Sequence, residues 1–349
     1  MKRMMLIIKI LLFFALLFVL YLAGVILYAQ FTQYKPEVSS AAAIQGRSDE
    51  QVGRDTLTVY TWNLGYGGIG KDADFFYDGG KMVRSPEEKV EQNIKGIIAE
   101  METWHDADFI LLQEVDEIAK RSWKIPEREM ITERLSGQFP VAVFAKNYDV
   151  RFVPMPLDRP MGKVISGILS LSRYQQSEAV RYAYPANFPW PKGLFFLNRC
   201  FLLQRYPYKG KELVVVNTHN SAFDGGVLKK QEMDFLKKYL LEEYAKGNYV
   251  IMGGDWNQVP PGYAGNARAE YEETPVPAHY PAKDWKWVAD LSHRSNRKVD
   301  TPYIKGVTYT TILDFFLVSP NVEVLKVEGK ELNFQYTDHE PVKIQVRLL

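Results

Sequence analysis

The stretch YVIMGGDWN, residues 249–257, decides the fold that we expect for this chain. Four apolar residues are followed by Gly253 and Gly254, which predicts a buried strand that ends in a tight turn at the edge of a sheet. After the turn, Asp255 and Asn257 can project to the same side. A carboxylate there can hold a cation or a water molecule, and an amide can donate to an anion, which suits phosphate ester chemistry. An ordinary surface turn is the alternative, because Gly, Asp and Asn all favour turns.

Other predicted strands also end on polar side chains. Residues 57–62 alternate and are rich in β-branched and aromatic side chains, and Asn63 follows them. The apolar run 109–112 leads to Glu114. Because an unpaired carboxylate is costly to bury, Glu114 either reaches solvent or meets a cation.

Three more segments place acids and histidines at strand ends. A strand predicted at 213–217 leads to His219, and the apolar row 312–318 contains Asp314, an acid that needs a partner. Asp338 and His339 precede the last alternating strand. The bland alternative is that Asp314 is a paired core acid and the histidines are satisfied loop residues.

Strands and helices alternate along the chain. Helical spacing of apolar residues predicts helices at 86–101 and 228–244, and strand, helix and strand in that order indicate a layered α/β arrangement. Further strands are expected near 141–145, 164–171, 195–203 and 342–346, a long surface loop over 260–281, and either a helix or a strand at 285–290.

The N-terminus predicts a membrane anchor. Residues 10–29 are almost entirely apolar, and a helix of that length spans about 30 Å, the thickness of the hydrocarbon layer. Lys2, Arg3 and Lys9 precede it, so the positive-inside rule keeps the N-terminus in the cytoplasm and sends the rest across. A cleaved signal peptide is the alternative, but its apolar core is usually about 7–15 residues.

The net charge and the cysteine count argue against some classes of function and of structural site. The formal net charge is +1, and three of the positive charges lie in the first nine residues, so the remainder has no basic excess. It therefore lacks the sequence-wide footprint of tight non-specific nucleic-acid binding. Cys200 is the only cysteine, which rules out an intrachain disulfide and a thiolate metal cluster.

Taken in order, these strand ends resemble the motifs of the endonuclease/exonuclease/phosphatase superfamily, which includes deoxyribonuclease-I-like nucleases, abasic-site endonucleases, sphingomyelinases and inositol polyphosphate 5-phosphatases. Each motif alone is weak, but the ordered set is specific. The resemblance implies an α/β (α+β) fold, a four-layer sandwich of two packed β-sheets flanked by helices. The matching motifs are Thr61-Trp62-Asn63, Leu112-Gln113-Glu114-Val115, Ser172-Arg173-Tyr174, Asn217-Thr218-His219, Gly254-Asp255-Trp256-Asn257, 313–319 and 337–342.

The resemblance also implies roles for these residues. Glu114 would be the principal ligand of Mg²⁺, with Mn²⁺ as the other candidate, since such ions prefer a few carboxylates and keep some waters. Asp338 would be a further metal or water ligand. Asp255 would orient or deprotonate the attacking water, while the amides of Asn63 and Asn257 would donate to phosphoryl oxygens.

The two histidines and one arginine complete the implied site. Asp314 would orient the imidazole of His339, which stabilises developing charge, because a carboxylate behind a histidine fixes its tautomer. His219 matches a histidine that acts as general acid, although the carboxylate that backs it in the deoxyribonuclease branch has no counterpart that we can place. Arg173 is the candidate phosphate-binding arginine, with an ordinary ion-pair arginine as the alternative.

We therefore expect an anchor at residues 1–29, a tether at 30–56 and a catalytic domain at 57–349 on the extracytoplasmic side, with no obligate protein partner evident. The expected activity is hydrolysis of a phosphoester with a divalent metal. The substrate is either a nucleic acid, or a phospholipid, sphingomyelin-like or small phosphoester. A catalytically silent binding module is the alternative of another class. The insertions 65–84 and 174–191 are expected to shape the substrate cleft.

Overall fold

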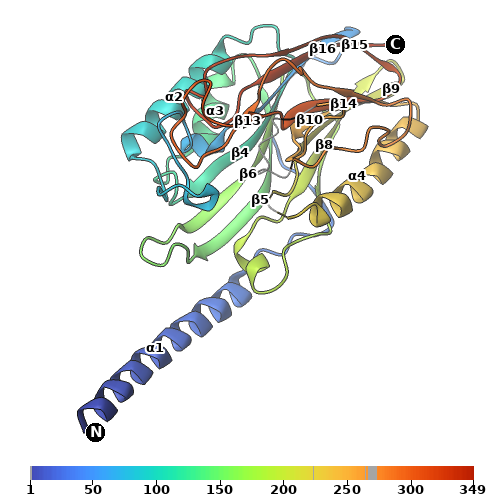
Figure 1. Cartoon of the computed structure of the whole chain (residues 1–349). Helices are drawn as coiled ribbons and strands as arrows, with labels where there is room; N and C mark the ends of the chain where they lie inside the picture. Colours follow the sequence, from blue (N-terminus) through green and yellow to red (C-terminus); the bar gives the residue numbers. More distant parts are fainter. Residues whose placement is uncertain (1, 223, 264, 266–272) are drawn as a thin grey trace.

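The computed structural model describes residues 2–222, 224–263, 265 and 273–349. Two seven-stranded mixed sheets pack against each other (Figure 1). The first sheet has the order β1 (Ser39–Ala41), β7 (Glu178–Ala183), β8 (Cys200–Tyr208), β9 (Lys211–His219), β10 (Tyr249–Asp255), β14 (Asp314–Val318) and β11 (Lys286–Val288). The second has the order β15 (Val322–Gly329), β16 (Val342–Leu348), β3 (Thr56–Asn63), β4 (Phe109–Ala119), β6 (Gly162–Ser172), β5 (Val141–Val153) and β2 (Ile44–Gly46).

Helices cover the outer faces of both sheets. Residues of α2 (Glu87–Glu102) and α3 (Glu127–Leu135) share a buried cluster with the second sheet, and residues of α4 (Val227–Ala245) share one with the first. The expected four-layer sandwich is thus confirmed. Short elements complete the domain, namely η1 (Gly65–Gly67), η2 (Phe76–Asp78), η3 (Lys192–Phe195) and the hairpin of β12 (Asn296–Arg297) with β13 (Thr310–Thr311).

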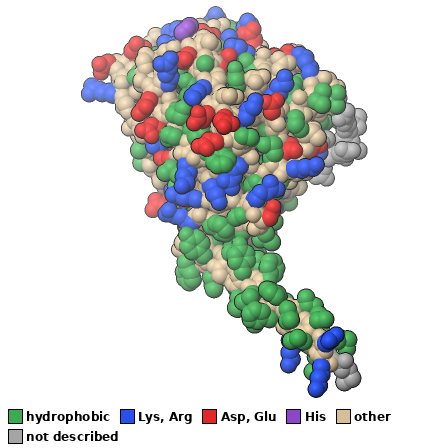
Figure 2. Space-filling view, turned by 90° about the vertical axis from the view of Figure 1, so that its left-hand side faces the viewer, with side chains coloured by type: hydrophobic (Ala, Val, Ile, Leu, Met, Phe, Trp, Pro, Cys, Tyr) green, Lys and Arg blue, Asp and Glu red, His purple; other side chains and the backbone are tan. Residues whose placement is uncertain are grey.

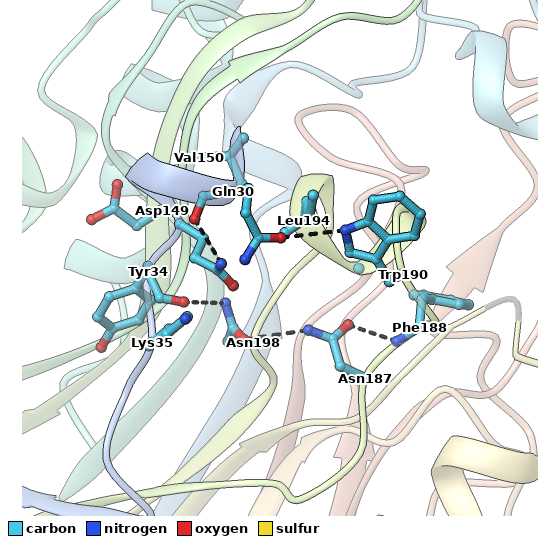
Figure 3. Close-up of a pocket in the computed structure, with 12 residues that line it drawn as sticks. Gln30, Tyr34, Lys35, Asp149, Val150, Asn187, Phe188, Trp190, Leu194 and Asn198 are labelled. Atoms are coloured by element: carbon cyan, nitrogen blue, oxygen red, sulfur yellow. Dashed lines mark hydrogen bonds between the residues drawn. The ribbon is translucent and has the colours of Figure 1, made fainter. Parts of the chain in front are cut away.

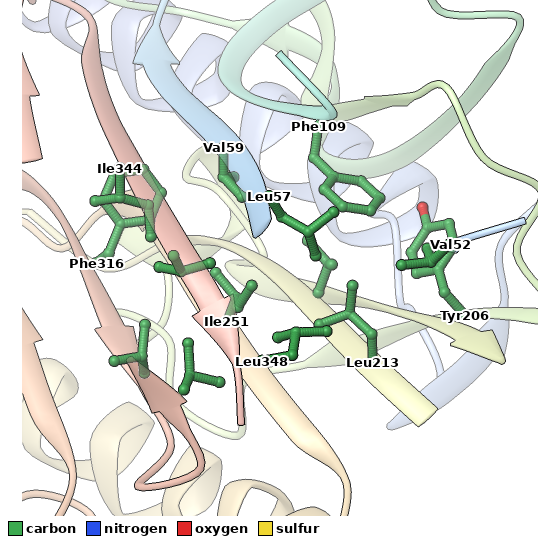
Figure 4. Packing of buried hydrophobic residues seen from close by; sticks show 14 of the residues in the cluster. Val52, Leu57, Val59, Phe109, Tyr206, Leu213, Ile251, Phe316, Ile344 and Leu348 are labelled. Carbon is green, nitrogen blue, oxygen red and sulfur yellow. The ribbon is translucent and has the colours of Figure 1, made fainter. Parts of the chain in front are cut away.

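The main core lies between the two sheets (Figure 4). Leu57 and Phe109 from the second sheet pack with Leu213, Ile251 and Phe316 from the first, and each is at most 1% exposed. Burying a side chain of this size contributes about 1.5–3 kcal/mol to folding. The alternating strands of the sequence therefore point their apolar residues at this interface.

The two glycines after the apolar run of β10 are needed because neighbours approach closely. A Cβ on Gly253 would lie 2.5 Å from the Phe316 ring, and a Cβ on Gly254 would lie 2.0 Å from the carbonyl oxygen of Thr218 on β9. Gly254 also has a φ of +153°. Glycine thus lets β10 pass between its neighbours and deliver Asp255.

Several elements differ from expectation. The expected strand at 195–203 begins only at Cys200, and the undecided segment 285–290 contains the strand β11. The helix α3 and the strands β7 and β15 were not expected, because their sequences lack clear periodicity. The loop expected over 260–281 falls partly outside the described residues.

The N-terminal helix α1 (Lys2–Thr32) runs out from one end of the domain (Figure 1). It has 31 residues and a mean hydropathy of 3.0 over its most apolar stretch, and Ala29 is its only buried residue. By length and composition it can span a membrane, and a signal sequence has the same composition. Figure 2 shows its apolar side chains as a continuous stalk.

The segment expected as a tether, residues 30–56, is not a free linker. Within it, β1 pairs with β7 and β2 pairs with β5, each at the edge of a sheet. Val52 is 6% exposed and belongs to the main core. This pairing was not predicted, because edge pairing uses backbone groups and needs no apolar alternation.

Candidate active site

The sheet register brings the polar strand ends together. In the first sheet, Asp255 on β10 is paired with His219 on β9 and with Asp314 on β14, so these three residues form one row across neighbouring strands. In the second sheet, β3 runs parallel to β4, so Asn63 and Glu114 also lie near one edge. Parallel strands carry their carboxyl ends to the same edge, which explains the convergence.

The loop before β16 adds Asp338 and His339 to this edge. The indole of Trp62 donates to the backbone carbonyl of His339 at 3.0 Å, and the hydroxyl of Thr337 donates to the carbonyl of Asn63 at 3.1 Å. Both bonds tie the loop to β3. The loop is therefore held by the same strand that supplies Asn63.

The cluster is compact and centred on Asp255. Its Oδ2 atom lies 3.4 Å from Nε2 of His219 and 3.8 Å from Nε2 of His339. Nε2 of His219 also lies 3.8 Å from Oε1 of Glu114. The side-chain amide of Asn63 donates to Oδ2 of Asp255 at 2.9 Å. Residues that are up to 276 positions apart in the printed sequence thus meet in one place.

Asp314 and His339 form a buried pair. Oδ2 of Asp314 lies 2.7 Å from Nδ1 of His339, and the two side chains are 0% and 6% exposed. Burial alone lowers the pKa of His339, but the carboxylates of Asp314 and Asp338 outweigh it and raise that pKa. The imidazole is therefore held in its protonated form with Nε2 facing Asp255.

His219 has the opposite electrostatics. Burial, followed by the positive charge of Arg199, lowers its pKa well below the usual range, so the imidazole is neutral. Its Nδ1 atom is buried, and no described residue forms a hydrogen bond with it. The described structure therefore provides no carboxylate behind His219, in agreement with the missing motif.

Two groups of ligands could hold a divalent cation. Asp255, Asp314 and His339 each offer one ligand atom within 4.8 Å of the others, so this buried group could hold a metal ion. Glu114 is the second candidate: its side chain is 24% exposed, and its Oε1 atom lies 3.8 Å from Nε2 of His219. Burial raises the pKa of Glu114, and the negative charge of Asp338 adds to this. A cation between Glu114 and Asp338 would relieve that repulsion, so these residues fit a metal ligand set.

Asn257 and Glu114 lie on unusual backbone. Their φ angles are +49° and +52°, a region that costs energy for residues other than glycine. The backbone N–H of Asn257 donates to Oδ1 of Asp255, and its side-chain amide donates to the carbonyl of Asn220 at 2.9 Å. Asn257 thus supports Asp255 from below the cluster.

Arg173 is the one predicted site residue that the structure does not bring to the cluster. It follows β6, which runs antiparallel to β4, so it lies at the opposite edge of the sheet. There its guanidinium donates to the carbonyls of Ala107 and His105 and stacks on Phe139. The phosphate-binding role implied for Arg173 is therefore wrong in this fold.

Three residues beside the cluster were not in the predicted set. Arg199 is 9% exposed, lines the cleft near Glu114 and His219, and its Nη1 atom has no hydrogen-bond partner among the described residues. Arg121 stacks 3.7 Å from the ring centre of Tyr66. The amide of Asn296 lies 2.9 Å from Nε2 of His339. Asn296 lies outside the family motifs, and Arg199, also outside them, was interpreted from the sequence as a surface or ion-pair arginine rather than a phosphate ligand.

The cluster lies in a cleft with a volume of about 900 Å³. Both insertions contribute to its walls: Tyr66 and Tyr77 come from 65–84, and Asn187 and Phe188 come from 174–191. Phe195 and Phe196 extend the apolar part of the wall. The rings of Phe188 and Tyr77 each contact that of Phe196, so these aromatic side chains are grouped in one part of the cleft, which we call its aromatic end.

The layered fold with its acid and histidine cluster defines a hydrolase of phosphate esters. The sequence matches the Endonuclease/Exonuclease/phosphatase family over residues 60–339, so the chain belongs to this family. Family members are metal-dependent phosphoesterases and nucleases, and the chain is an enzyme of this kind. No curated protein matches the chain in sequence.

Solved structures share the fold at low sequence identity. An endonuclease/exonuclease/phosphatase from Beutenbergia cavernae DSM 12333 has 17% identity and a TM-score of 0.57, over 84% of this chain and 72% of that one. One from Bacteroides vulgatus has 15% identity and a TM-score of 0.53, over 84% and 99%. D. rerio TDP2 complexed with single strand DNA product has 12% identity and a TM-score of 0.52, over 84% and 99%.

Proposed function

We propose that this protein is a membrane-anchored, divalent-metal-dependent phosphodiesterase. The observation that carries the proposal is the convergence of four residues from separate segments. Glu114 lies 3.8 Å from His219, His219 lies 3.4 Å from Asp255, and Asp255 lies 3.8 Å from His339. Such a cluster combines a base, a protonated histidine and a carboxylate with open ligand positions. These are the groups that hydrolysis of an anionic ester needs.

Asp255 is the proposed base. In the reaction a water molecule attacks phosphorus, the bond to the leaving oxygen breaks, and the proton of the water passes to a carboxylate oxygen of Asp255. Oδ2 of Asp255 already accepts a hydrogen bond from Asn63, and Oδ1 accepts one from the backbone of Asn257. Both bonds fix the direction of the carboxylate.

The charge that builds on the phosphoryl group is met by cationic groups. His339, whose pKa the carboxylates of Asp314 and Asp338 raise, lines the cleft, and its Nε2 atom lies 3.8 Å from Oδ2 of Asp255. We assign phosphoryl binding to Arg199 in place of Arg173, because Arg199 lines the cleft and its buried Nη1 atom has no hydrogen-bond partner among the described residues. A divalent ion held by Glu114 and Asp338 would neutralise further charge on the phosphoryl oxygens.

His219 faces the leaving group side of the cluster in this proposal. Its lowered pKa leaves it neutral, so Nε2 acts as a hydrogen-bond donor or acceptor rather than as an imidazolium acid. The role of general acid implied for it therefore depends on a substrate that raises its pKa. An anionic phosphate within hydrogen-bond reach would do so.

Anchoring by α1 is part of the proposal. The helix carries the N-terminus in the cytoplasm, and residues 57–349, together with the edge strands β1 and β2, form the catalytic domain on the extracytoplasmic side. Lys2, Arg3 and Lys9 before the apolar stretch support this orientation.

Two substrate classes remain candidates. A nucleic acid is the first, since the cluster is of the kind that nucleases use. A phospholipid or other small phosphodiester is the second, and the aromatic end of the cleft, with Phe188, Phe195 and Phe196, favours it. The lack of basic excess in the domain also favours it.

The test is an activity screen of the full-length chain in detergent. DNA, RNA, sphingomyelin, inositol phosphates and an aryl phosphodiester are each assayed with Mg²⁺, with Mn²⁺ and with excess chelator. We expect one class to be hydrolysed, with activity lost in chelator and restored by either ion. Full activity in chelator, or hydrolysis unaffected by Asp255→Ala, would contradict the proposal.

A further inference from the structure

Specific contacts join α1 to the domain (Figure 3). The indole N–H of Trp190 donates to the side chain of Gln30 at 3.3 Å, and the amide of Asn198 donates to the backbone carbonyl of Tyr34 at 3.4 Å. Lys146 lies 4.3 Å from the ring centre of Tyr34. These contacts fix the segment around Trp190 relative to the end of the helix.

The position of Gln30 sets the depth of this segment in a membrane. The apolar stretch 10–29 is as long as the hydrocarbon layer is thick, so Gln30 lies where hydrocarbon gives way to head groups. A side chain that is bonded to Gln30 has the same depth. Trp190 is 67% exposed, and tryptophan is the residue type that favours this interface.

The segment that carries Trp190 also forms the aromatic end of the active-site cleft. Asn187 and Phe188 line both the hollow beside α1 and the cleft that contains Glu114 and Asp255. Lys192, which lies 3.7 Å from the ring centre of Phe188, lines the cleft as well. The cleft therefore opens next to the point where the helix enters the bilayer.

A second exposed apolar loop lies on the same side of the domain. The loop between β5 and β6 projects on the side from which α1 leaves (Figure 1). Its Met155 and Leu157 are 46% and 48% exposed, with Arg159 exposed beside them. Figure 2 shows Lys and Arg side chains, with some Asp and Glu side chains among them, on the part of the domain nearest the apolar stalk.

We propose that residues 187–196 and the β5–β6 loop form a lipid-contact surface that holds the aromatic mouth of the cleft at the bilayer surface. The partner is the head-group layer of the membrane that α1 spans, and phosphodiesters at that layer enter the cleft from its aromatic end. The inference rests on the proposed anchoring by α1. Because the junction is fixed, the catalytic domain does not swing freely above the membrane.

The test uses full-length chain in vesicles of phosphatidylcholine and phosphatidylglycerol. Single cysteines, W190C and L157C, are labelled with a fluorophore and exposed to lipids that carry a quencher near the head group. Cys200 is 0% exposed, so the parent chain gives the labelling background. L325C, on β15 at the far end of the domain in Figure 1, is the aqueous control, and L16C in α1, tested with a deep acyl-chain quencher, reports the span.

We expect quenching at positions 190 and 157 to be several-fold greater than at position 325. Equal quenching at 190, 157 and 325, with L16C quenched, would overturn the lipid contact while leaving the anchor intact. An unquenched L16C would overturn both. Hydrolysis of a soluble aryl phosphodiester by the same samples, with and without chelator, reports separately whether the proposed activity is present.

Discussion

Both edges of the sandwich carry buried charged residues. At one edge they are fully hydrogen-bonded, and at the other some of their polar atoms have no partner among the described residues. At the edge where β3, β4, β9 and β10 begin, Asp108 accepts hydrogen bonds from the backbone of Thr58 at 2.8 Å and from the hydroxyl of Tyr174 at 2.6 Å, and pairs with Arg54. At the edge where these strands end, buried polar atoms of His219, Asp314 and Arg199 have no partner among the described residues.

The difference separates stability from function. Buried charges whose hydrogen bonds are satisfied stabilise the packing of neighbouring elements. Removing one partner leaves the other group buried without a hydrogen bond, which costs its full desolvation free energy. Unsatisfied groups cost free energy in the folded chain and are retained where a ligand or a reaction uses them. We therefore assign hydrolysis to the edge at which the strands end and structural support to the edge at which they begin, and the following variants test that division.

The largest effect is expected from Asp255→Ala and His339→Ala. Each removes a group that acts on the reacting atoms, so the hydrolysis rate should fall by about 10³-fold or more. Circular dichroism and the melting temperature check that the fold is retained. Parent-like rates in both variants would move the reaction away from this edge.

Asp108→Asn should lower stability and leave activity unchanged. It leaves Arg54 without its ionic partner and weakens the bonds from Thr58 and Tyr174, so the free energy of unfolding should fall by about 3 kcal/mol. The rate per folded molecule should stay at the parent value. Denaturant titration and hydrolysis assays on the same preparation measure both quantities, and a selective loss of activity would break the comparison.

Glu243, at the end of α4, lies at the same edge and should make the free energy of unfolding depend on pH. Burial raises its pKa, but hydrogen bonds from Arg205, Lys246 and Asn248 outweigh burial and lower it to about 2. A carboxylate whose pKa is lower in the folded chain stabilises the fold at pH values above its unfolded pKa of about 4.3. This contribution is lost as the pH falls from about 4.3 toward about 2. Glu243→Gln should be less stable by about 2–3 kcal/mol at pH 6. The gap between variant and parent in urea unfolding should close near pH 2, and a constant gap would refute the assignment.

Arg199→Ala should lower the hydrolysis rate by about 10- to 100-fold, the value of one or two charge-assisted hydrogen bonds to a phosphoryl group. Arg199→Lys, which keeps the charge but loses the planar donor set, is the matched control. Its hydrolysis rate should lie between those of the parent and of Arg199→Ala. A fully active Arg199→Ala variant would show that the unpaired Nη1 has no role in phosphate binding.

The smallest effect is expected from Arg173→Ala. Its hydrogen bonds to two backbone carbonyls at the structural edge contribute about 1 kcal/mol, so the melting temperature should decrease slightly. Hydrolysis should stay at the parent rate. A large loss of activity without loss of stability would restore the phosphate-binding role that the motif implied.

The sequence was sufficient to predict the layered fold and most of the cluster. Apolar runs that stop at Asn63, His219 and Asp255 mark the ends of β3, β9 and β10, and parallel pairing places these residues near one edge. Glu114 was also expected at a strand end, but it lies within β4, at the irregularity between Leu112 and Val115. Arg173 was misassigned because a strand end in sequence does not say which edge it reaches. The direction of β6 relative to β4 decides that, and it depends on long-range pairing.

Residues without a motif could not be predicted. Arg199 is adjacent in sequence to the buried Cys200, and only the packing around the cleft shows that its guanidinium faces Glu114 and His219. The edge strands β1 and β2 are three residues long and mostly exposed, so no apolar pattern marks them. Backbone pairing at a sheet edge leaves little trace in composition.

One pair of variants tests the division between the two edges most directly. Glu114→Gln and Asp108→Asn each replace one carboxylate by its amide, and both are measured for hydrolysis with Mg²⁺ and for the free energy of unfolding. We predict that Glu114→Gln loses activity and keeps or gains stability, because it removes repulsion with Asp338, whereas Asp108→Asn loses stability and keeps activity per folded molecule. An active Glu114→Gln enzyme, together with an inactive but stable Asp108→Asn protein, would contradict the account.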